Sequence, residues 1–411
     1  MKKKIILLCL VIGVLNASSV SANFNSTTSG INSNLKSLEK TTEGNYTIQW
    51  QMDYGSDWGY GARYEGPQPI GDSDNDGKNE LLISGRDCMI RVMEWNENTN
   101  TYNQTHSLRP PLYPLIRCDA GGMAIGDVNN DGKNEIAATW YSALYKYSLG
   151  RYKIFGLNSW IFRNGGGNPD CLIGDCDNDG KNEVIMSAGP LRITSSVPPI
   201  VILKWNGWRL AKVASWDDLG IVGLGYVYMA GLGDVDYDEQ NEIVCACKRK
   251  VFVLNWDKDQ GAFNSTIILG EQHVEDLPFG CVCKDCDGDG KSEILISYYA
   301  PHITILKWNG TGYETQFDVS WPGGDPVIEG IDAGDADDDG IPEVCAGAGV
   351  THILQWNGTS YVEETVLPTY GSMAVVSIGD CDNDGLNEIN AGNVDVNFGQ
   401  SFMEWVFKYS N

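Results

Sequence analysis

The stretch "GDSDNDGKNE", from Gly71 to Glu80, carries four carboxylates close together. Numbered from its first Asp, it has acidic residues at positions 1, 3, 5 and 9, and Gly77 at position 6. Like charges at this spacing repel one another, so a folded chain needs a cation to compensate them. Carboxylates at alternate positions converge when the chain curls around one point. Glycine at position 6 permits the positive φ that such a curl requires.

Variants of this stretch occur seven times, with starting points 45 to 59 residues apart. Each copy is followed by a short apolar run such as "LLIS", then by a run that ends in an aromatic residue, such as "VMEW" or "ILKW". Turn residues such as Asn309-Gly310 come next and lead into a further alternating run, so each unit predicts about four hairpin-linked strands. The other six copies are "GDVNNDGKNE" from Gly126, "GDCDNDGKNE" from Gly174, "GDVDYDEQNE" from Gly233, "KDCDGDGKSE" from Lys284, "GDADDDGIPE" from Gly334 and "GDCDNDGLNE" from Gly379.

Seven four-stranded units without helical periodicity predict an all-β fold, a seven-bladed β-propeller over residues 45–411. A linear stack of the same units is the alternative, but the chain ends favour a ring. The C-terminal "VFKYSN" aligns with "ILKWNG" and then stops before its hairpin partner. The segment "GNYTIQW", from Gly44 to Trp50, resembles that missing partner. We therefore expect an N-terminal strand to complete the last blade and to remove the exposed sheet edges.

The acidic loops are predicted to bind calcium, which takes six to eight oxygen ligands in flexible geometry. Magnesium and a merely solvated acidic turn are the alternatives. An EF-hand is excluded because its position 12 needs Glu, and here that position is Ile83 within a predicted strand. The predicted ligands, with the backbone carbonyl at position 7 named last for each loop that keeps it, are Asp72, Asp74, Asp76, Glu80 and Lys78; Asp127, Asn129, Asp131, Glu135 and Lys133; Asp175, Asp177, Asp179, Glu183 and Lys181; Asp234, Asp236, Asp238 and Glu242; Asp285, Asp287, Asp289, Glu293 and Lys291; Asp335, Asp337, Asp339, Glu343 and Ile341; and Asp380, Asp382, Asp384, Glu388 and Leu386.

Two loops depart from the pattern. The second has Asn129 at position 3, which keeps an oxygen ligand but loses a charge. The fourth has Glu239 where the glycine belongs, and a residue with a side chain is strained in that turn. We therefore expect six or seven calcium sites, with the site at Asp234 the weakest or empty.

The tandem D-x-D-x-D-G-x-x-E units resemble the FG-GAP/VCBS repeats of integrin α-subunit propellers and of many secreted microbial proteins. The resemblance covers residues 45 to 411. It implies that the calcium loops lie on one face of the propeller. It also implies that ligands or partner chains bind loops on the opposite face.

Long polar connections between the units carry aromatic and arginine residues, and their topology places them opposite the acidic hairpins. Such side chains are suited to stacking on sugars or gripping a protein loop. Capping of the core by the same rings is an equal alternative. The candidate ligand-binding residues are Trp58, Arg63, Trp160, Arg163, Trp216 and Trp321.

A second set of aromatics occurs once per unit, at the same place each time. Repeated placement predicts packing between blades rather than ligand binding. These residues are Trp95, Tyr147, Trp205, Trp256, Trp308 and Trp356.

The N-terminus reads as an export signal over residues 1–22. Three lysines precede an apolar run from Ile5 to Leu15, and Val20-Ser21-Ala22 fits a signal-peptidase site. An uncleaved anchor is the alternative. Residues 23–44 are rich in Ser, Thr and Asn and predict a flexible lead-in. The chain is therefore expected to be secreted or held at the cell surface, with no membrane-inserted segment after cleavage.

The net charge of −26 is explained mainly by the predicted metal loops. Six loops use four acidic residues each and the second uses three, which makes 27 of the 55 acidic residues. This acidity argues against nucleic acid as a partner. Eleven of the twelve cysteines follow the export signal, and we expect mainly buried free thiols, with local bridges Cys171–Cys176 and Cys281–Cys286 as the alternative.

These features favour a calcium-binding module for adhesion to a protein or a glycan. A calcium-dependent polysaccharide lyase is the second hypothesis, and a structural surface protein is the third. Only four histidines are present, and neither G-x-S-x-G nor H-E-x-x-H occurs, so catalysis finds little support in the sequence.

Overall fold

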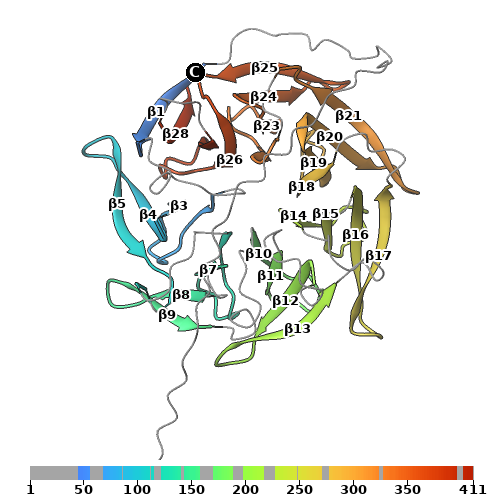
Figure 1. Ribbon diagram of the computed structural model, residues 1–411, viewed down its shortest axis with the longest axis horizontal. Helices are drawn as coiled ribbons and strands as arrows, with labels where there is room; N and C mark the ends of the chain where they lie inside the picture. The colour runs from blue at the N-terminus through green and yellow to red at the C-terminus, as the bar shows by residue number, and fades with distance from the viewer. Residues whose placement is uncertain are drawn as a thin grey trace, which may run out of the picture. The chain divides into compact units, whose positions relative to one another are not determined.

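The computed structural model describes residues 45–55, 68–85, 87–111, 113–114, 122–139, 143–157, 170–187, 198–216, 227–247, 249–270, 277–323, 327–395 and 401–410. All of them belong to one compact unit, Lys36–Asn411. They form seven four-stranded antiparallel sheets arranged around a ring (Figure 1). The predicted export signal and lead-in, residues 1–44, lie outside the described residues. In the described part of the chain, no helix has the length and apolarity needed to span a membrane.

Each sheet is one blade, and the strands of blades 1 to 6 follow one another in chain order. The short apolar runs after each acidic loop become second strands, and the runs that end in an aromatic residue become third strands. The strands are β2 (Ile70–Gly71), β3 (Glu80–Gly85), β4 (Met89–Asn96) and β5 (Thr101–Leu108) in blade 1; β6 (Met123–Gly126), β7 (Glu135–Ala138), β8 (Ala143–Tyr147) and β9 (Tyr152–Gly156) in blade 2; β10 (Cys171–Gly174), β11 (Glu183–Ser187), β12 (Ile200–Trp205) and β13 (Leu210–Trp216) in blade 3; β14 (Ala230–Gly233), β15 (Glu242–Cys247), β16 (Lys250–Asp257) and β17 (Ala262–Leu269) in blade 4; β18 (Pro278–Lys284), β19 (Glu293–Tyr298), β20 (Ala300–Trp308) and β21 (Tyr313–Ser320) in blade 5; β22 (Ile331–Gly334), β23 (Glu343–Gly347), β24 (Thr351–Trp356) and β25 (Tyr361–Leu367) in blade 6; and β26 (Ser372–Gly379), β27 (Glu388–Asp395), β28 (Met403–Tyr409) and β1 (Tyr46–Asp53) in blade 7.

The predicted ring closure is confirmed, because the N-terminal strand β1 is the fourth strand of the last blade. It pairs antiparallel with β28, with Tyr46 opposite Tyr409 and Asp53 opposite Met403. The pairing skips one residue at Gln49, which forms a bulge. The two ends of the propeller are thus held together in one sheet, as Figure 1 shows at the meeting of β1 and β28.

The hydrophobic core is divided into seven clusters, and each cluster lies between two neighbouring blades. The cluster that closes the ring joins Trp50 and Cys381 of blade 7 to Leu81 and Tyr102 of blade 1. Trp50 is 8% exposed, so β1 contributes a large buried ring to this junction. The stability of the propeller therefore depends on inter-blade packing all the way around.

The glycine that begins the acidic motif allows this close packing of the first strands. A Cβ atom built on Gly126 would lie 2.9 Å from Cγ2 of Ile173, in the first strand of the next blade. The same atom on Gly174 would lie 2.4 Å from Cδ2 of Leu232. Blade 5 alone replaces this glycine, with Lys284, whose Nζ lies 2.5 Å from Oδ1 of Asp332 in blade 6.

One buried carboxyl group in blade 7 lies outside the acidic loops. Glu404 on β28 has no exposed surface, and the side-chain amide of Asn390 donates a hydrogen bond of 2.9 Å to its Oε1. Gly392 on the paired strand leaves room for this carboxyl, since a Cβ atom there would lie 2.6 Å from Oε2. Burial raises the pKa of Glu404 from 4.5 to about 8.

This raised pKa makes stability depend on pH. The folded state holds a proton that the unfolded chain releases above pH 4.5, so the stabilisation is complete below that pH and is lost as pH rises through about 8. We expect the slope to approach about 1.4 kcal/mol per pH unit in this window. Urea unfolding of the wild type and of Glu404→Gln from pH 5 to 8.5 measures it. The unfolding free energy of the variant should change less with pH than that of the wild type. Equal slopes would contradict the prediction.

Candidate metal centres

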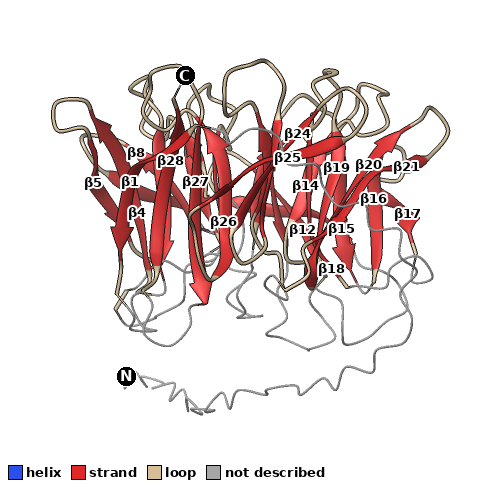
Figure 2. Cartoon of the chain, turned by 90° about the horizontal axis from the view of Figure 1, so that it is seen from above, coloured by secondary structure: helices blue, strands red, loops and turns tan. Residues whose placement is uncertain are grey.

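The acidic loops join the first strand to the second strand of every blade and therefore all lie at one edge of the ring. The hairpins between third and fourth strands lie at the same edge, where the C-terminus is also found (Figure 2). The connections from one blade to the next begin and end at the other edge. This arrangement agrees with the two-faced organisation expected from the sequence.

Each loop is held in its curl by its own carboxylates. In blade 1, Asp72 at position 1 accepts hydrogen bonds from the backbone N–H groups of Asp76, at 3.1 Å, and Gly77, at 3.0 Å. Asp76 in turn accepts one from the N–H of Lys78 at 2.9 Å. Asn75 and Gly77, at positions 4 and 6, have φ values of 66° and 92°, so the curl needs two left-handed residues rather than the one expected.

The loop of blade 4 keeps this shape in spite of its substitution at position 6. Glu239 adopts a φ of 69°, and its N–H donates to Oδ2 of Asp234 at 3.0 Å, as the glycine does in blade 1. A side chain in this region of backbone space is strained. The expected weakness of this site rests on that strain and stays a prediction.

The glutamate at position 9 connects the loop to the core. Glu80 is 3% exposed, and its Oε2 accepts hydrogen bonds from both the backbone N–H of Ser73, at 2.8 Å, and its hydroxyl, at 2.6 Å. Five of the other loops repeat the backbone bond from position 2 to position 9. Burial raises the pKa of Glu80 to about 7 and that of Glu343 to about 8. A cation beside these groups would favour their charged form.

The loop carboxylates converge as a metal site requires. In blade 1, one oxygen each of Asp72, Asp74, Asp76 and Glu80 lies within 4.8 Å of the others, and three acidic residues converge in this way in each of blades 3 to 6. Some of these oxygens are enclosed and have no hydrogen-bond partner, including Oδ1 of Asp236 and of Asp335. Clusters made only of oxygen atoms fit a hard divalent cation. The chain therefore has several acidic clusters able to hold a metal ion.

Three features on this side of the ring were not predicted from the sequence. The first is a set of hydrogen bonds that link neighbouring loops. The side chain of Asn134, at position 8 in blade 2, donates to the carbonyl of Asp72 in blade 1 at 2.8 Å. Asn75 and Asn134 exchange a further pair of bonds at 3.0 and 2.7 Å. Similar bonds connect blades 2 with 3, 3 with 4, and 7 with 1. The recurring Asn at positions 4 and 8 was the available signal.

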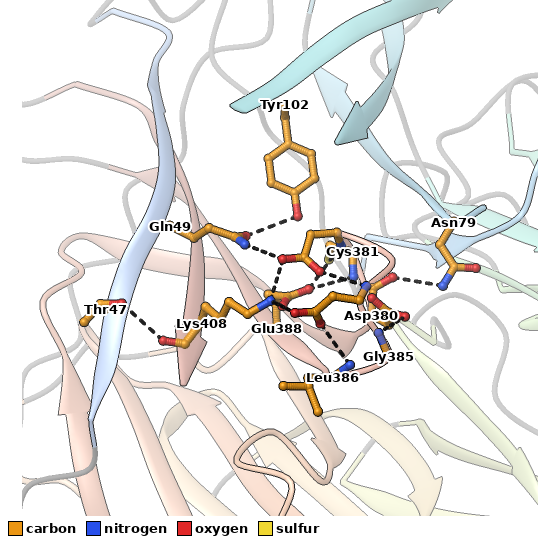
Figure 3. A network of polar contacts seen from close by, with 12 residues as sticks. Thr47, Gln49, Asn79, Tyr102, Asp380, Cys381, Gly385, Leu386, Glu388 and Lys408 are labelled. Carbon is orange, nitrogen blue, oxygen red and sulfur yellow. Dashed lines mark hydrogen bonds and ion pairs between the residues drawn. The ribbon is translucent and has the colours of Figure 1, made fainter. Parts of the chain in front are cut away.

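The second missed feature is a lysine that enters the loop from the third strand. In blade 7, Nζ of Lys408 lies 2.5 Å from Asp382, 2.6 Å from Asp384 and 3.0 Å from Glu388 (Figure 3). Burial disfavours the ammonium, but hydrogen bonds to these carboxylates outweigh that effect and raise its pKa. The corresponding lysines of blades 2, 3 and 5 are Lys146, Lys204 and Lys307. These lysines directly precede the recurring aromatic residue, as in "LYKY" and "ILKW". From the sequence, a role was assigned to the aromatic residue and none to the lysine.

The third missed feature is an exposed tryptophan on the acidic-loop side of the ring. Trp208 lies in the hairpin between β12 and β13 and is 75% exposed. The sequence "KWNGWRL" contained the signal, since an aromatic residue in a hairpin turn has no strand to pack it.

The candidate ligand-binding residues are only partly placed by the structure. Trp58, Arg63, Trp160 and Arg163 lie outside the described residues. Trp216 is 5% exposed and packs edge-to-face on Phe252, at 4.9 Å between ring centroids, so its ring belongs to the core and presents almost no surface to a ligand. Trp321 is half-buried and stacks on His352, with centroids 4.4 Å apart. The position of Trp216 therefore agrees with the alternative in which the ring caps the core.

The aromatics that recur once per blade are half-buried and pair with other rings. Trp95 packs on Tyr102 at 4.9 Å, and Trp205 packs across the blade junction on Phe155 at 4.9 Å. Similar ring pairs form at Tyr147, Trp256, Trp308 and Trp356. Trp95, Trp205 and Trp356 pack against clusters between blades, as expected. The ring pairs of Tyr147, Trp256 and Trp308 lie within one blade. The cysteines considered for local bridges, Cys171, Cys176, Cys281 and Cys286, are buried free thiols.

The fold and loops define the class of the protein as a seven-bladed propeller with acidic hairpin loops on one face. A family model described as FG-GAP-like repeat matches residues 285–346, which span the acidic loops of blades 5 and 6. This match and the fold confirm the resemblance to FG-GAP propellers. A comparison with curated proteins gives no match.

Solved structures similar to this chain are propellers too. BBS1N, crystallised in complex with ARL6DN, matches with a TM-score of 0.60 at 12% identity, over 90% of this chain and 98% of that chain. The Dos1 propeller matches with a TM-score of 0.51 at 9% identity, over 83% of this chain and 78% of that chain. At these identities the likeness concerns the fold alone.

Proposed function

We propose that this protein is an exported calcium-binding propeller that attaches to a protein or glycan partner. The observation that carries the proposal is the gathering of seven acidic loops on one edge of a closed ring. These loops commit their carboxylates to a cation and leave the blade-to-blade connections at the other edge for a partner. Calcium suits the loops better than magnesium, which demands a near-ideal octahedron and keeps several waters.

Two further observations support parts of this proposal. BBS1N, a propeller of similar fold, is described in complex with a protein, which favours a protein ligand for the ring. The residues at the N-terminus favour export to the cell surface or medium, where free calcium is available to fill the loops. The acidity of the molecule makes nucleic acid an unfavourable partner.

A calcium-dependent polysaccharide lyase is the second candidate, because a cation beside an open cleft can neutralise a sugar carboxylate. It needs a basic residue or tyrosine close to the metal. The third-strand lysines of blades 3, 5 and 7, which enter the loops, are engaged with carboxylates, and this favours the binding module. A structural surface protein without a dedicated ligand is the third candidate.

A glycan array probed in calcium buffer, together with a lyase assay on acidic polysaccharides, tests the proposal. The Trp160→Ala/Trp321→Ala variant should lose most binding and keep its calcium-dependent melting. Asp74→Ala should do the reverse, with a lower melting temperature and a smaller change in affinity. Trp208→Ala is the matched control on the acidic-loop side and should bind as the wild type does.

The outcomes separate the three candidates. Release of unsaturated sugar products would replace the binding module by the lyase. Loss of binding in Trp208→Ala alone would move the binding surface to the acidic-loop face. Absence of any ligand on the array and in a protein-interaction screen would favour a structural role.

A further inference from the structure

The acidic loops differ in whether the chain supplies its own cation. In blade 5, Nζ of Lys307 lies 2.5 Å from Asp287, 2.9 Å from Asp289 and 2.9 Å from Glu293, so its ammonium forms ion pairs with three carboxylates. The ammonium thus occupies the point on which positions 3, 5 and 9 converge. Blades 3 and 7 repeat this contact in full, and blade 2 repeats it at positions 5 and 9.

The other three blades have no lysine at this place. The residue before the recurring aromatic is Glu94 in blade 1, Asn255 in blade 4 and Gln355 in blade 6. In blade 6, the amide of Gln355 donates to Asp339 at 2.8 Å and to Glu343 at 3.0 Å. A neutral amide satisfies hydrogen bonds there but leaves the negative charge uncompensated.

A buried carboxylate on the fourth strand distinguishes blade 6, whereas Glu94, the additional carboxylate of blade 1, is half-buried on the third strand. The fourth strands of blades 5, 6 and 7 have a bulge at the same place, and the bulged residues are Gln316, Glu364 and Gln49. Gln316 and Gln49 donate to the position-3 aspartates of their blades at 2.5 and 2.6 Å. An ionised glutamate has no proton to donate, so Glu364 brings an acceptor to the bulge where the other two blades have a donor.

The surroundings of Glu364 show that this carboxylate lacks a partner. It is 9% exposed, and its Oε2 atom is enclosed without a hydrogen bond. The bulge places Glu364 at the position from which Gln316 and Gln49 reach the loops of their own blades. Oδ1 of Asp335 in the same loop is also enclosed and unpaired. Buried carboxylate oxygens without hydrogen-bond partners are stabilised by a nearby cation.

We propose that blade 6 holds the tightest divalent-cation site of the ring, with Glu364 as a ligand beside Asp335, Asp337, Asp339 and Glu343, and that the lysine-bearing loops bind calcium weakly. This inference rests on the proposed calcium binding and adds the rank of the sites. A metal entering a lysine-bearing loop must first displace a tethered ammonium, whereas in blade 6 it displaces only the neutral amide of Gln355. The sites of blades 1 and 4 should rank next in affinity, because these blades also lack the lysine. The lysine, rather than the residue at position 6, then sets the order of the sites.

A reciprocal exchange between blades 5 and 6 tests the proposal in the full chain. The Gln355→Lys/Glu364→Gln variant gives blade 6 the pattern of blade 5, and Lys307→Gln/Gln316→Glu gives blade 5 the pattern of blade 6. Calcium binding is measured by calorimetry and equilibrium dialysis, and melting is measured in chelator. The blade 6 exchange should remove the tightest site and raise melting in chelator. The blade 5 exchange should add one tight site and lower melting in chelator.

Single substitutions keep the test decisive if an exchange variant does not fold. Glu364→Gln reproduces the residue of blades 5 and 7 and should weaken the tightest site by roughly tenfold, since calcium affinity follows the charge of the ligand set. Glu314→Gln is the control, because Glu314 is an exposed carboxylate on the fourth strand of blade 5, and it should leave the tightest site unchanged. Magnesium in place of calcium should bind this site more weakly because a flexible five-carboxylate cage suits the larger ion.

The result that overturns this inference differs from the one that overturns calcium binding itself. Seven equal sites in the wild type, or an unchanged tightest site in Glu364→Gln, would show that lysine and Glu364 do not set the order. No calcium bound to the wild type at millimolar concentration would refute the proposed calcium binding for all loops. In that case the two exchanges would also leave calcium titrations flat.

Discussion

Removal of calcium by a chelator should lower the melting temperature of this protein by about 10 °C, if three sites are tight. Each site stabilises the native state by about 2.7 kcal/mol when calcium is at a hundredfold excess over its dissociation constant. Three sites together then contribute about 8 kcal/mol, which is comparable to the whole stability of many domains. The physical cause is repulsion among loop carboxylates that are fixed in place by their own hydrogen bonds to the backbone.

Differential scanning calorimetry with calcium, magnesium and chelator measures this effect. Asp337→Asn removes one loop carboxylate of blade 6 and should lose part of the calcium-dependent shift. Asp259→Asn is the control, because Asp259 is an exposed carboxylate in the hairpin between β16 and β17, at the same edge but outside the acidic loops. Equal melting with and without chelator would refute metal binding, and an equal response of both variants would show an unspecific charge effect.

The fold was predictable because its determinants are local and repeat. An acidic turn with Asp at alternate positions, such as Asp72 to Gly77, dictates its own curl through hydrogen bonds within six residues. Seven such turns fix the phase of 28 strands, and the incomplete last unit exposed the role of Tyr46 to Trp50 as its missing strand. Periodicity therefore carried the information on topology.

The details of the metal loops were not predictable because they depend on contacts between residues far apart in the sequence. Whether Lys408 reaches Asp382 depends on the register between β27 and β28, which no motif states. Glu364 reaches its loop only because a bulge turns it away from the ordinary alternation of β25. Trp216 was expected at the end of a last strand or in the connection that follows it. It is the last residue of β13, pairs with Ile200 and lies in the core.

Loss of the N-terminal strand should have the second large effect, because β1 closes the ring. Trp50 is 8% exposed and fills the junction of blades 7 and 1, so Trp50→Ala should cost about 3–5 kcal/mol of unfolding free energy. Ile48 is 43% exposed on the same strand, and Ile48→Ala is the matched control, with an expected change within about 0.5 kcal/mol. Urea unfolding compares the two variants. It is followed by far-UV circular dichroism rather than by tryptophan fluorescence, because one variant lacks a tryptophan.

Deletion of residues 45–50 extends this test from packing to the sheet edge. It removes the partner of β28 from Tyr409 to Val406 and leaves a row of backbone N–H and C=O groups unpaired at that edge. An unpaired edge strand pairs readily with another chain, so the deletion variant should melt at a lower temperature and form dimers or aggregates in light scattering. Added peptide with the sequence of residues 45–53 should restore the monomer, since it supplies the missing strand. A monomeric deletion variant with wild-type melting would show that inter-blade packing alone holds the ring closed.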